Sequence, residues 1–169
     1  MTLISDNIEA DTQHRILVVA ERLFREIGYQ KTTVGDIAKQ LRMSPANVYR
    51  FFPSKDAIRQ GVAQRLMSEV EEAAQAIAVA PGPAAERLRQ MLTTIHHMNS
   101  ERYVGDSKLH EMVAIAMEED WAVCKTHMER IIGIIAEVIA AGAATGEFQV
   151  PDVMLASLCT CNAMMRFRR

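Results

Sequence analysis

The chain of 169 residues has few aromatic residues, glycines, prolines and cysteines. Aromatic side chains make up 5% of it, and it holds 8 glycines and 5 prolines. Because no stretch of useful length alternates apolar and polar residues, the pattern disfavours a β-sandwich or a β-barrel. Alanine, isoleucine, leucine, methionine and glutamate recur instead, and 49% hydrophobic residues suffice for a core. We predict an all-α protein.

The three cysteines do not indicate a disulfide framework. Cys159 and Cys161 lie two residues apart, which on a helix turns their side chains about 200° away from each other. The polar, acidic start of the chain has neither the basic nor the apolar region of a secretory signal. The most apolar run, residues 131–144, is interrupted by Glu137 and is too short for a membrane span. We expect a cytoplasmic protein with free thiols and no membrane partner.

The first 52 residues predict three helices. Apolar residues at helical spacing indicate a helix over about residues 12–28, with Gly28 as a left-handed cap. Thr33 and Asp36 form a capping-box pattern before a short helix over 34–41. Ser44 and Pro45 then start a helix over 45–52. Two short helices separated by a three-residue turn and braced by a preceding helix are typical of a helix-turn-helix.

The helix over 45–52 has a side suited to the major groove of DNA. Val48 and the two phenylalanines after it share one side, and Ala46 and Arg50 point the opposite way. Ala46 allows a close approach of the backbone, Asn47 can pair with base edges, and Arg50 can reach guanine or phosphate. Hydroxyls and a cation at the helix starts and the groove edge can hold phosphates. The predicted DNA contacts are Thr33, Ser44, Pro45, Ala46, Asn47, Tyr49, Arg50 and Lys55.

Charge is distributed unevenly along the chain. The whole chain has a net charge of −2, but residues 31–60 hold six basic and two acidic residues, a net +4. The other 139 residues hold 13 basic and 19 acidic residues, a net −6. A small basic segment on an acidic remainder favours a nucleic-acid partner for that segment.

Two stretches carry a resemblance to a known family. Thr-Thr-Val-Gly-Asp-Ile-Ala from residue 32, and Met-Ser-Pro-Ala-Asn-Val-Tyr-Arg-Phe-Phe-Pro-Ser-Lys-Asp from residue 43, resemble the motif of the tetracycline-repressor (TetR/AcrR) family of bacterial regulators. The resemblance covers roughly residues 12 to 60. It implies a homodimer that binds a palindromic operator in double-stranded DNA and is released by a small effector. It also implies DNA contacts for most of the residues proposed above, with Arg50 at a position where many relatives have an aromatic residue.

The rest of the chain predicts further helices after a break at Ala80-Pro-Gly-Pro. They are expected over about 54–79, 84–98, 107–118 and 120–144 and from 151 onward, with a polar loop around 100–106. We predict a helix-turn-helix DNA-binding domain over residues 1–60 and a helical effector-binding and dimerisation domain over 61–169. The stretch from Asp106 to Val113, with Trp121, His127 and Gly146-Glu-Phe, resembles C-terminal domains of some family members.

Methionine is frequent in the second half, and eight of the 11 methionines lie between Met91 and Met165. This flexible side chain lines adaptable cavities as readily as it fills a helical core, and both interpretations stay open. The candidate effector pocket consists of Met91, Ile95, Met98, His110, Met112, Met117, Trp121, Cys124, His127 and Met128.

Two other response mechanisms and one other class of protein are alternatives. Cys124 and His127 are three residues apart on one helix face, a spacing that can share a metal ion, although no second pair lies near in sequence. A thiol-redox response is the other alternative within the fold. Neither a phosphate loop, a nucleophile elbow nor a metal-hydrolase helix is present, so we expect no metal, no cofactor and no enzyme. A helical enzyme or interaction module without DNA binding is the alternative from another class.

The last predicted helix provides a candidate dimer interface. The resemblance implies two C-terminal helices that form a four-helix interface, and family members commonly continue past residue 169. We therefore expect an unusually short or C-terminally truncated chain. The interface candidates are Met154, Leu155, Leu158, Ala163 and Met165.

Overall fold

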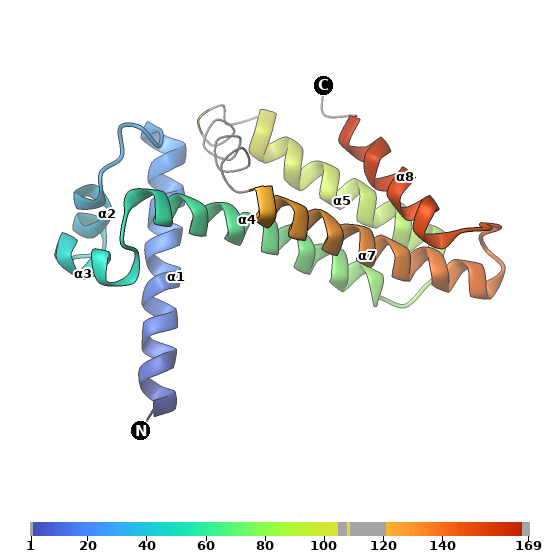
Figure 1. The fold of residues 1–169 in the computed structure, drawn as a ribbon, viewed down its shortest axis with the longest axis horizontal. Helices are drawn as coiled ribbons and strands as arrows, with labels where there is room; N and C mark the ends of the chain where they lie inside the picture. Colours follow the sequence, from blue (N-terminus) through green and yellow to red (C-terminus); the bar gives the residue numbers. More distant parts are fainter. Residues whose placement is uncertain (1, 105–107, 109–120, 167–169) are drawn as a thin grey trace. The chain divides into compact units, whose positions relative to one another are not determined.

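A computed structural model of the chain describes residues 2–104, 108 and 121–166. Over these ranges it has seven α-helices and no strand (Figure 1), which confirms the predicted all-α class. The chain divides into two compact units. The first holds the residues up to Arg65 together with Lys108, and the second holds residues 66–104 and 121–166.

The first unit contains α1 (Thr2–Ile27), α2 (Val34–Gln40), α3 (Pro45–Phe51) and the start of α4 (Lys55–Ala78). α2 packs against both α1 and α3, as expected for a helix-turn-helix braced by a preceding helix. Burial of apolar side chains between these helices is the main favourable contribution to the stability of the unit. Its buried apolar residues are Ile16, Ala20, Leu23, Phe24, Val34, Ile37, Ala38, Val48, Ile58, Val62 and Ala63.

Local capping forms the turns of the first unit as predicted. Gly28 has φ +91° and its N–H donates to the carbonyl of Phe24 at 3.0 Å, which ends α1. Thr33 and Asp36 form the capping box at the start of α2. Ser44 caps α3 by accepting a hydrogen bond from the Asn47 N–H.

α1 begins at Thr2, so the predicted start near residue 12 is wrong. Residues 8–11 are exposed, and such a segment leaves no apolar periodicity in the sequence. Its backbone hydrogen bonds are those of the helix itself, with an added bond from the Thr12 hydroxyl to the Ile8 carbonyl at 2.8 Å.

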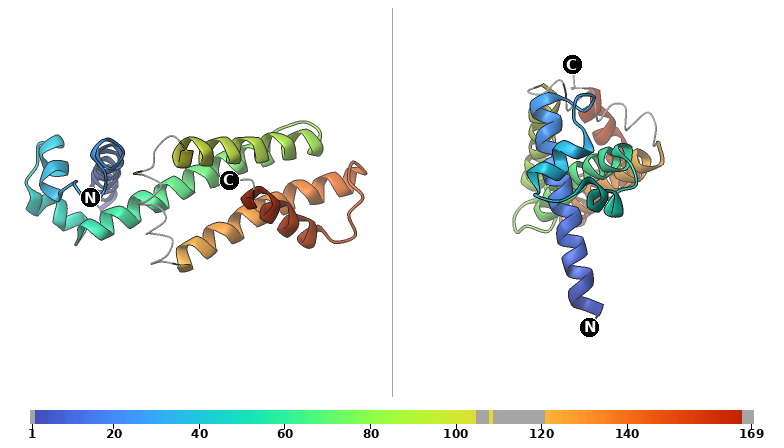
Figure 2. Two further views of the ribbon diagram at one scale, coloured as in Figure 1. Left: turned by 90° about the horizontal axis from the view of Figure 1, so that it is seen from above. Right: turned by 90° about the vertical axis from the view of Figure 1, so that its left-hand side faces the viewer.

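The second unit contains the remainder of α4, α5 (Ala84–Val104), α7 (Trp121–Thr145) and α8 (Val153–Arg166). α7 packs against α5 and α8 (Figure 2). α4 contributes the inward-facing residues Val70 and Ala74 to the same core. The remaining fully buried residues of this core include Met91, Ile95, Ile131, Ile135, Val138, Ile139 and Cys161.

α5 extends beyond the predicted helix, because residues 99–104, most of them polar, are helical and do not form the expected loop. They include neither glycine nor proline, and the Ser100 hydroxyl lies 3.4 Å from the His96 ring nitrogen one turn before it. The predicted helix over 107–118 lies outside the described residues except for Lys108.

The turn between α7 and α8 holds the start of α5. The Glu147 carboxylate accepts hydrogen bonds from the N–H groups of Ala84 and Ala85, each at 3.1 Å. These two bonds come first among the causes that lower the pKa of Glu147 below its usual value. None of the described helices combines the length and the apolar character that a membrane span requires.

Candidate nucleic-acid interface

The candidate site is the exposed side of α3. Val48 is fully buried and anchors the helix, and Phe51 and Phe52 are half-buried on the same side, as predicted. Because burial fixes this side, the opposite side faces solvent. The exposed residues of that surface are Ser44, Pro45, Ala46, Tyr49 and Arg50.

Two polar side chains on this surface keep hydrogen-bonding capacity for a partner. The Ser44 hydroxyl oxygen accepts from the Asn47 N–H at 3.2 Å, which leaves its own proton to donate. The Arg50 guanidinium lies 4.8 Å from the centroid of the Phe51 ring, and no described carboxylate pairs with it. Asn47 is half-buried, and its amide nitrogen lies 3.9 Å from the Met43 sulfur.

Thr33 at the start of α2 is bound to its own helix. Its hydroxyl donates to the Asp36 carboxylate at 2.7 Å, and its backbone N–H donates to the same oxygen at 2.9 Å. The side-chain hydrogen bond from Thr33 comes first among the causes that lower the pKa of Asp36. Thr33 is exposed, but its hydroxyl proton is already committed within the capping box.

Lys55 lies at the first turn of α4 and faces the loop between α1 and α2. Its ammonium group donates to the carbonyl oxygens of Tyr29, Gln30 and Thr32 at 2.9, 3.4 and 3.0 Å. Sequence reasoning placed Lys55 beside phosphate and missed these partners, which lie 23 to 26 residues away along the chain. The sequence pattern also did not predict a role for Tyr29, which lies in the loop between two predicted helices and contacts Lys55.

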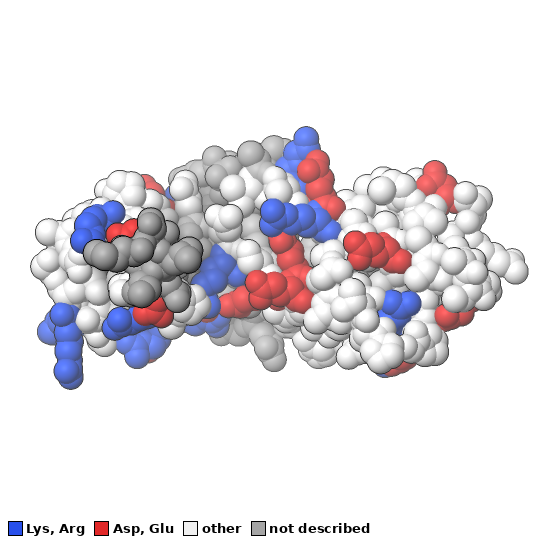
Figure 3. All heavy atoms as spheres, turned by 90° about the horizontal axis from the view of Figure 1, so that it is seen from below, with Lys and Arg blue, Asp and Glu red and all other residues white. Residues whose placement is uncertain are grey.

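Positive charge surrounds the candidate site. Lys31 and Lys39 are exposed in this region, as is Arg42 at the turn before α3, and the charge of Lys39 helps to lower the pKa of the nearby Asp36 carboxylate. Figure 3 shows Lys and Arg side chains projecting from the surface of the first unit, at the left of the view. A partner with repeated negative charge is favoured at such a surface.

The candidate effector residues that the structure describes belong to the second unit. Met91, Ile95 and Cys124 are buried, and Met98 and Met128 pack half-buried against the core. His110, Met112, Met117 and the side chain of Trp121 lie outside the described residues.

His127 has a partner that the sequence did not reveal. Its Nδ1 lies 2.7 Å from Oε1 of Glu71, and Arg130 donates to Oε2 of the same carboxylate at 3.0 Å. The His127 imidazole is therefore paired with a carboxylate from α4, and the spacing of Cys124 and His127 did not predict this partner. In the described part of the chain no three His, Cys, Asp or Glu side chains gather as a metal site would require.

The interface candidates lie on α8. Met154, Leu155 and Leu158 are 54%, 58% and 39% exposed, and Ala163 is exposed too. Ser157 and Cys161 are buried on the other side, where α8 packs against α7. The side chain of Met165 lies outside the described residues.

Two family models match the chain. The model described as bacterial regulatory proteins, tetR family, matches residues 16–62. The model described as a tetracyclin repressor-like C-terminal domain matches residues 84–169.

Individual proteins match as well. The HTH-type transcriptional regulator HbdR of Aromatoleum sp. (strain CIB) is 38% identical over 48 residues, which make up 28% of this chain and 21% of that protein. The match thus spans about a fifth of the length of this curated relative. A TetR/AcrR-family regulator from Thermobifida fusca YX-ER1 is 26% identical with a TM-score of 0.63, over 91% of this chain and 82% of that one. A protein from Saccharomonospora viridis, described as a transcriptional regulator and solved in complex with choline, shares the fold at 22% identity and a TM-score of 0.65, over 88% and 79% of the two chains.

Proposed function

Since the chain belongs to the TetR family of bacterial regulatory proteins, and is therefore a transcriptional regulator and not an enzyme, we propose that it acts as a ligand-responsive repressor. In this proposal a homodimer binds a palindromic operator in the cytoplasm, and a small, largely apolar effector releases it. The observation that carries the proposal is α3, which is capped by Ser44, anchored by the buried Val48 and exposed along the opposite side.

The proposed contacts follow from the chemistry of that exposed side. Pro45 and Ala46 are small enough at the start of α3 for its backbone to approach the major groove closely. Asn47 and Arg50 reach base edges, since an amide pairs with adenine and a guanidinium pairs with guanine. The residues proposed at phosphates are Ser44 and Tyr49, whereas Thr33 uses both its hydroxyl proton and its N–H on Asp36 and is not proposed there.

Dimerisation would place two such helices on one face of DNA. A palindromic operator presents half-sites about one helical turn apart, or ~34 Å, and a two-fold dimer matches that repeat. The exposed apolar residues of α8 support a dimer, because Met154, Leu155 and Leu158 would otherwise remain in water. Ala163 and Met165 extend the same proposed interface.

The proposed effector site lies in the second unit. Met91, Ile95, Met98 and Met128 form an apolar group there, and methionine adapts to ligands of different shape. His110 or His127 would supply a polar anchor in an otherwise apolar site. An effector must bind the released state more tightly than the DNA-bound state, by ~1–3 kcal/mol for typical coupling.

Selection from a random-sequence duplex library tests DNA binding without knowledge of the operator. The full chain is incubated with the library, and bound duplexes are amplified and sequenced over several rounds at physiological salt. We expect enrichment of a sequence with two inverted half-sites and a gel-shift band that survives excess non-specific DNA. If no sequence is enriched over unselected competitor, the DNA-binding proposal fails.

A further inference from the structure

The loop between α1 and α2 directs three of its carbonyl groups toward one side chain. The carbonyls of Tyr29 and Thr32 accept from Nζ of Lys55 at 2.9 and 3.0 Å, and that of Gln30 accepts at 3.4 Å. An ammonium group has three N–H donors. Every donor of Lys55 is therefore used inside the protein.

The aromatic ring of Tyr29 strengthens this arrangement. Nζ of Lys55 lies 4.3 Å from the ring centroid, within the range of a cation–π interaction. The Tyr29 hydroxyl donates to the carboxylate of Asp56 at 2.5 Å, and the ring packs edge-on against Phe24 at 5.4 Å between centroids. The loop thus contacts α1 on one side and the first turn of α4 on the other.

A second cation from α4 packs against the same ring. The guanidinium of Arg59 lies 5.4 Å from the centroid of Tyr29 and pairs with Asp56 at 3.4 Å. Arg59 is 2% exposed, so its guanidinium is shielded from solvent, whereas the Asp56 side chain is 64% exposed. Lys55 and Arg59 lie four residues apart and therefore on the same face of α4.

The end of this loop determines where α2 begins. Thr32 is fully buried, its hydroxyl donates to the Gly28 carbonyl at 2.8 Å, and the next residue is the N-cap of α2. α2 has only seven residues and packs directly against α3. Fixing the loop therefore fixes the start of the helix on which α3 rests.

We propose that Lys55 is a positioning residue for DNA recognition, which holds the α1–α2 loop and so orients α2 and α3 without contacting phosphate. This inference rests on the proposed DNA-binding function. If the ammonium turned to a phosphate, three carbonyl oxygens would lose their donor, two of them at good hydrogen-bond distance. Leaving such groups without a partner opposes the movement.

Three variants separate positioning from direct contact. Lys55→Met keeps most of the side-chain length and removes the charge, whereas Lys55→Arg keeps the charge but carries a planar group that cannot donate to all three carbonyls in the same way. Lys31→Met is the matched control, since Lys31 is an exposed lysine in the same loop and has no hydrogen bond with the described residues. Thermal unfolding checks that each variant is folded. If Lys55→Met does not fold, the comparison of Lys55→Arg with the wild type tests the proposal.

The first readout is the affinity for the duplex selected by the wild-type chain, measured over a range of salt concentrations. We expect both Lys55 variants to bind at least about tenfold more weakly, roughly the effect of one lost charge-assisted hydrogen bond. The slope of log K against log salt should stay at the wild-type value. A direct phosphate contact would instead make the slope shallower by about 0.9 in Lys55→Met and leave the affinity and slope of Lys55→Arg close to those of the wild type. That result would overturn the proposal.

The second readout is hydrogen–deuterium exchange of residues 28–37 in the protein without DNA. Both Lys55 variants should exchange faster there than the wild type, and Lys31→Met should not. Unchanged exchange in the Lys55 variants would also overturn the proposal. A wild-type chain that selects no DNA would count against the proposed function, whereas a binding wild type with a reduced slope in Lys55→Met would count against the role of Lys55 alone.

Discussion

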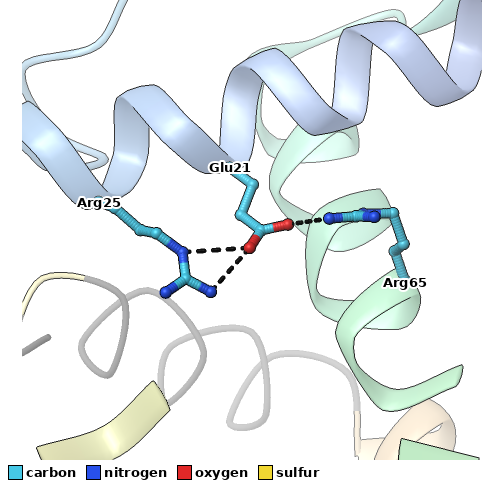
Figure 4. Close-up of polar contacts among 3 residues, drawn as sticks. All are labelled: Glu21, Arg25 and Arg65. Atoms are coloured by element: carbon cyan, nitrogen blue, oxygen red, sulfur yellow. Dashed lines mark hydrogen bonds and ion pairs between the residues drawn. The ribbon is translucent and has the colours of Figure 1, made fainter. Parts of the chain in front are cut away.

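The carboxylate of Glu21 in α1 forms an ion pair with the guanidinium of Arg65 in α4 (Figure 4). The second carboxylate oxygen accepts two hydrogen bonds from Arg25, at 2.8 and 3.1 Å. Glu21 is 8% exposed, and a carboxylate so buried is stable only when it is paired. The pair therefore fastens the third turn of α4 to α1 within the first unit.

The Glu21 pair predicts a pH-dependent stability. Burial raises the pKa of Glu21, but the hydrogen bonds and charges of Arg65 and Arg25 outweigh burial, and the pKa lies below its usual value of 4.5. A lowered folded pKa gives stability that is present above pH 4.5 and is lost as the pH falls through the folded pKa. Urea unfolding at a series of pH values should show this loss.

Glu21→Gln provides the comparison. At pH 7 we expect it to lower the free energy of unfolding by about 1–3 kcal/mol, because two arginines lose a charged partner. Its stability should then fall less steeply than that of the wild type below pH 4.5. Asp36, Glu86 and Glu147, whose pKa values are also lowered, contribute to the remaining fall. Parallel pH profiles for the two proteins would contradict the assignment.

Alanine substitutions at two glycines of α7 are expected to change the free energy of unfolding in opposite directions. A Cβ at Gly142 would lie 2.9 Å from the Cβ of Ala84 and still closer to the Phe148 ring, whereas a Cβ at Gly133 would meet nothing within 4 Å. Gly142→Ala should therefore destabilise the protein by about 1–3 kcal/mol through overpacking. Gly133→Ala should stabilise it by about 0.5–1 kcal/mol, since alanine favours the helix. Thermal unfolding of both variants tests this, and equal effects would refute the packing described for Gly142.

The sequence predicted features that depend on neighbouring residues. Gly28, the Thr33–Asp36 capping box and the Ser44–Pro45 helix start could be predicted because cap and helix lie within a few residues of each other. The buried side of α3 followed from helical periodicity in the same way.

Contacts between distant segments could not be predicted from such patterns. Lys55 with the loop carbonyls, Glu147 with the start of α5, and His127 with Glu71 join residues 23 to 63 positions apart. Only the packing of the helices brings these groups together. The exposed beginning of α1 could not be predicted for a related reason, since it buries no apolar side that would mark it in the sequence.

Arg42 predicts a stabilising substitution at the turn before α3. It has φ +55° and is the only non-glycine residue with positive φ in the described part of the chain. This conformation costs an L-residue with a Cβ about 1–2 kcal/mol. Arg42→Gly should raise the free energy of unfolding by about 0.5–1 kcal/mol once the greater freedom of unfolded glycine is subtracted. Arg42→Ala removes the same charge but keeps the Cβ, so a comparable gain in that variant would show that charge and not backbone strain is responsible.

Substitution of Arg50 is expected to reduce the preference of the protein for its operator sequence. If its guanidinium pairs with a base, Arg50→Ala should weaken binding to the selected duplex by about 1–3 kcal/mol and relax the preference at one base pair in each half-site. Arg50→Lys keeps the charge but not the two-pronged geometry, so it should lose the preference and keep the salt dependence. Competition gel shifts with duplexes altered at single positions provide the measurement. A uniform loss on all sequences with a shallower salt dependence would assign Arg50 to phosphate instead.

The exposed apolar residues of α8 predict a dimer that a single charge disrupts. Leu155 is 58% exposed, and burying a leucine side chain fully is worth about 1.5–3 kcal/mol on each subunit. Leu155→Glu would place an unpaired carboxylate in the interface, so the variant should be monomeric at concentrations where the wild type is dimeric. Val79→Glu is the matched control, because Val79 is 72% exposed just after the end of α4 and outside the proposed interface. Light scattering measures both masses, and either a monomeric wild type or a dimeric Leu155→Glu would exclude α8 as the interface.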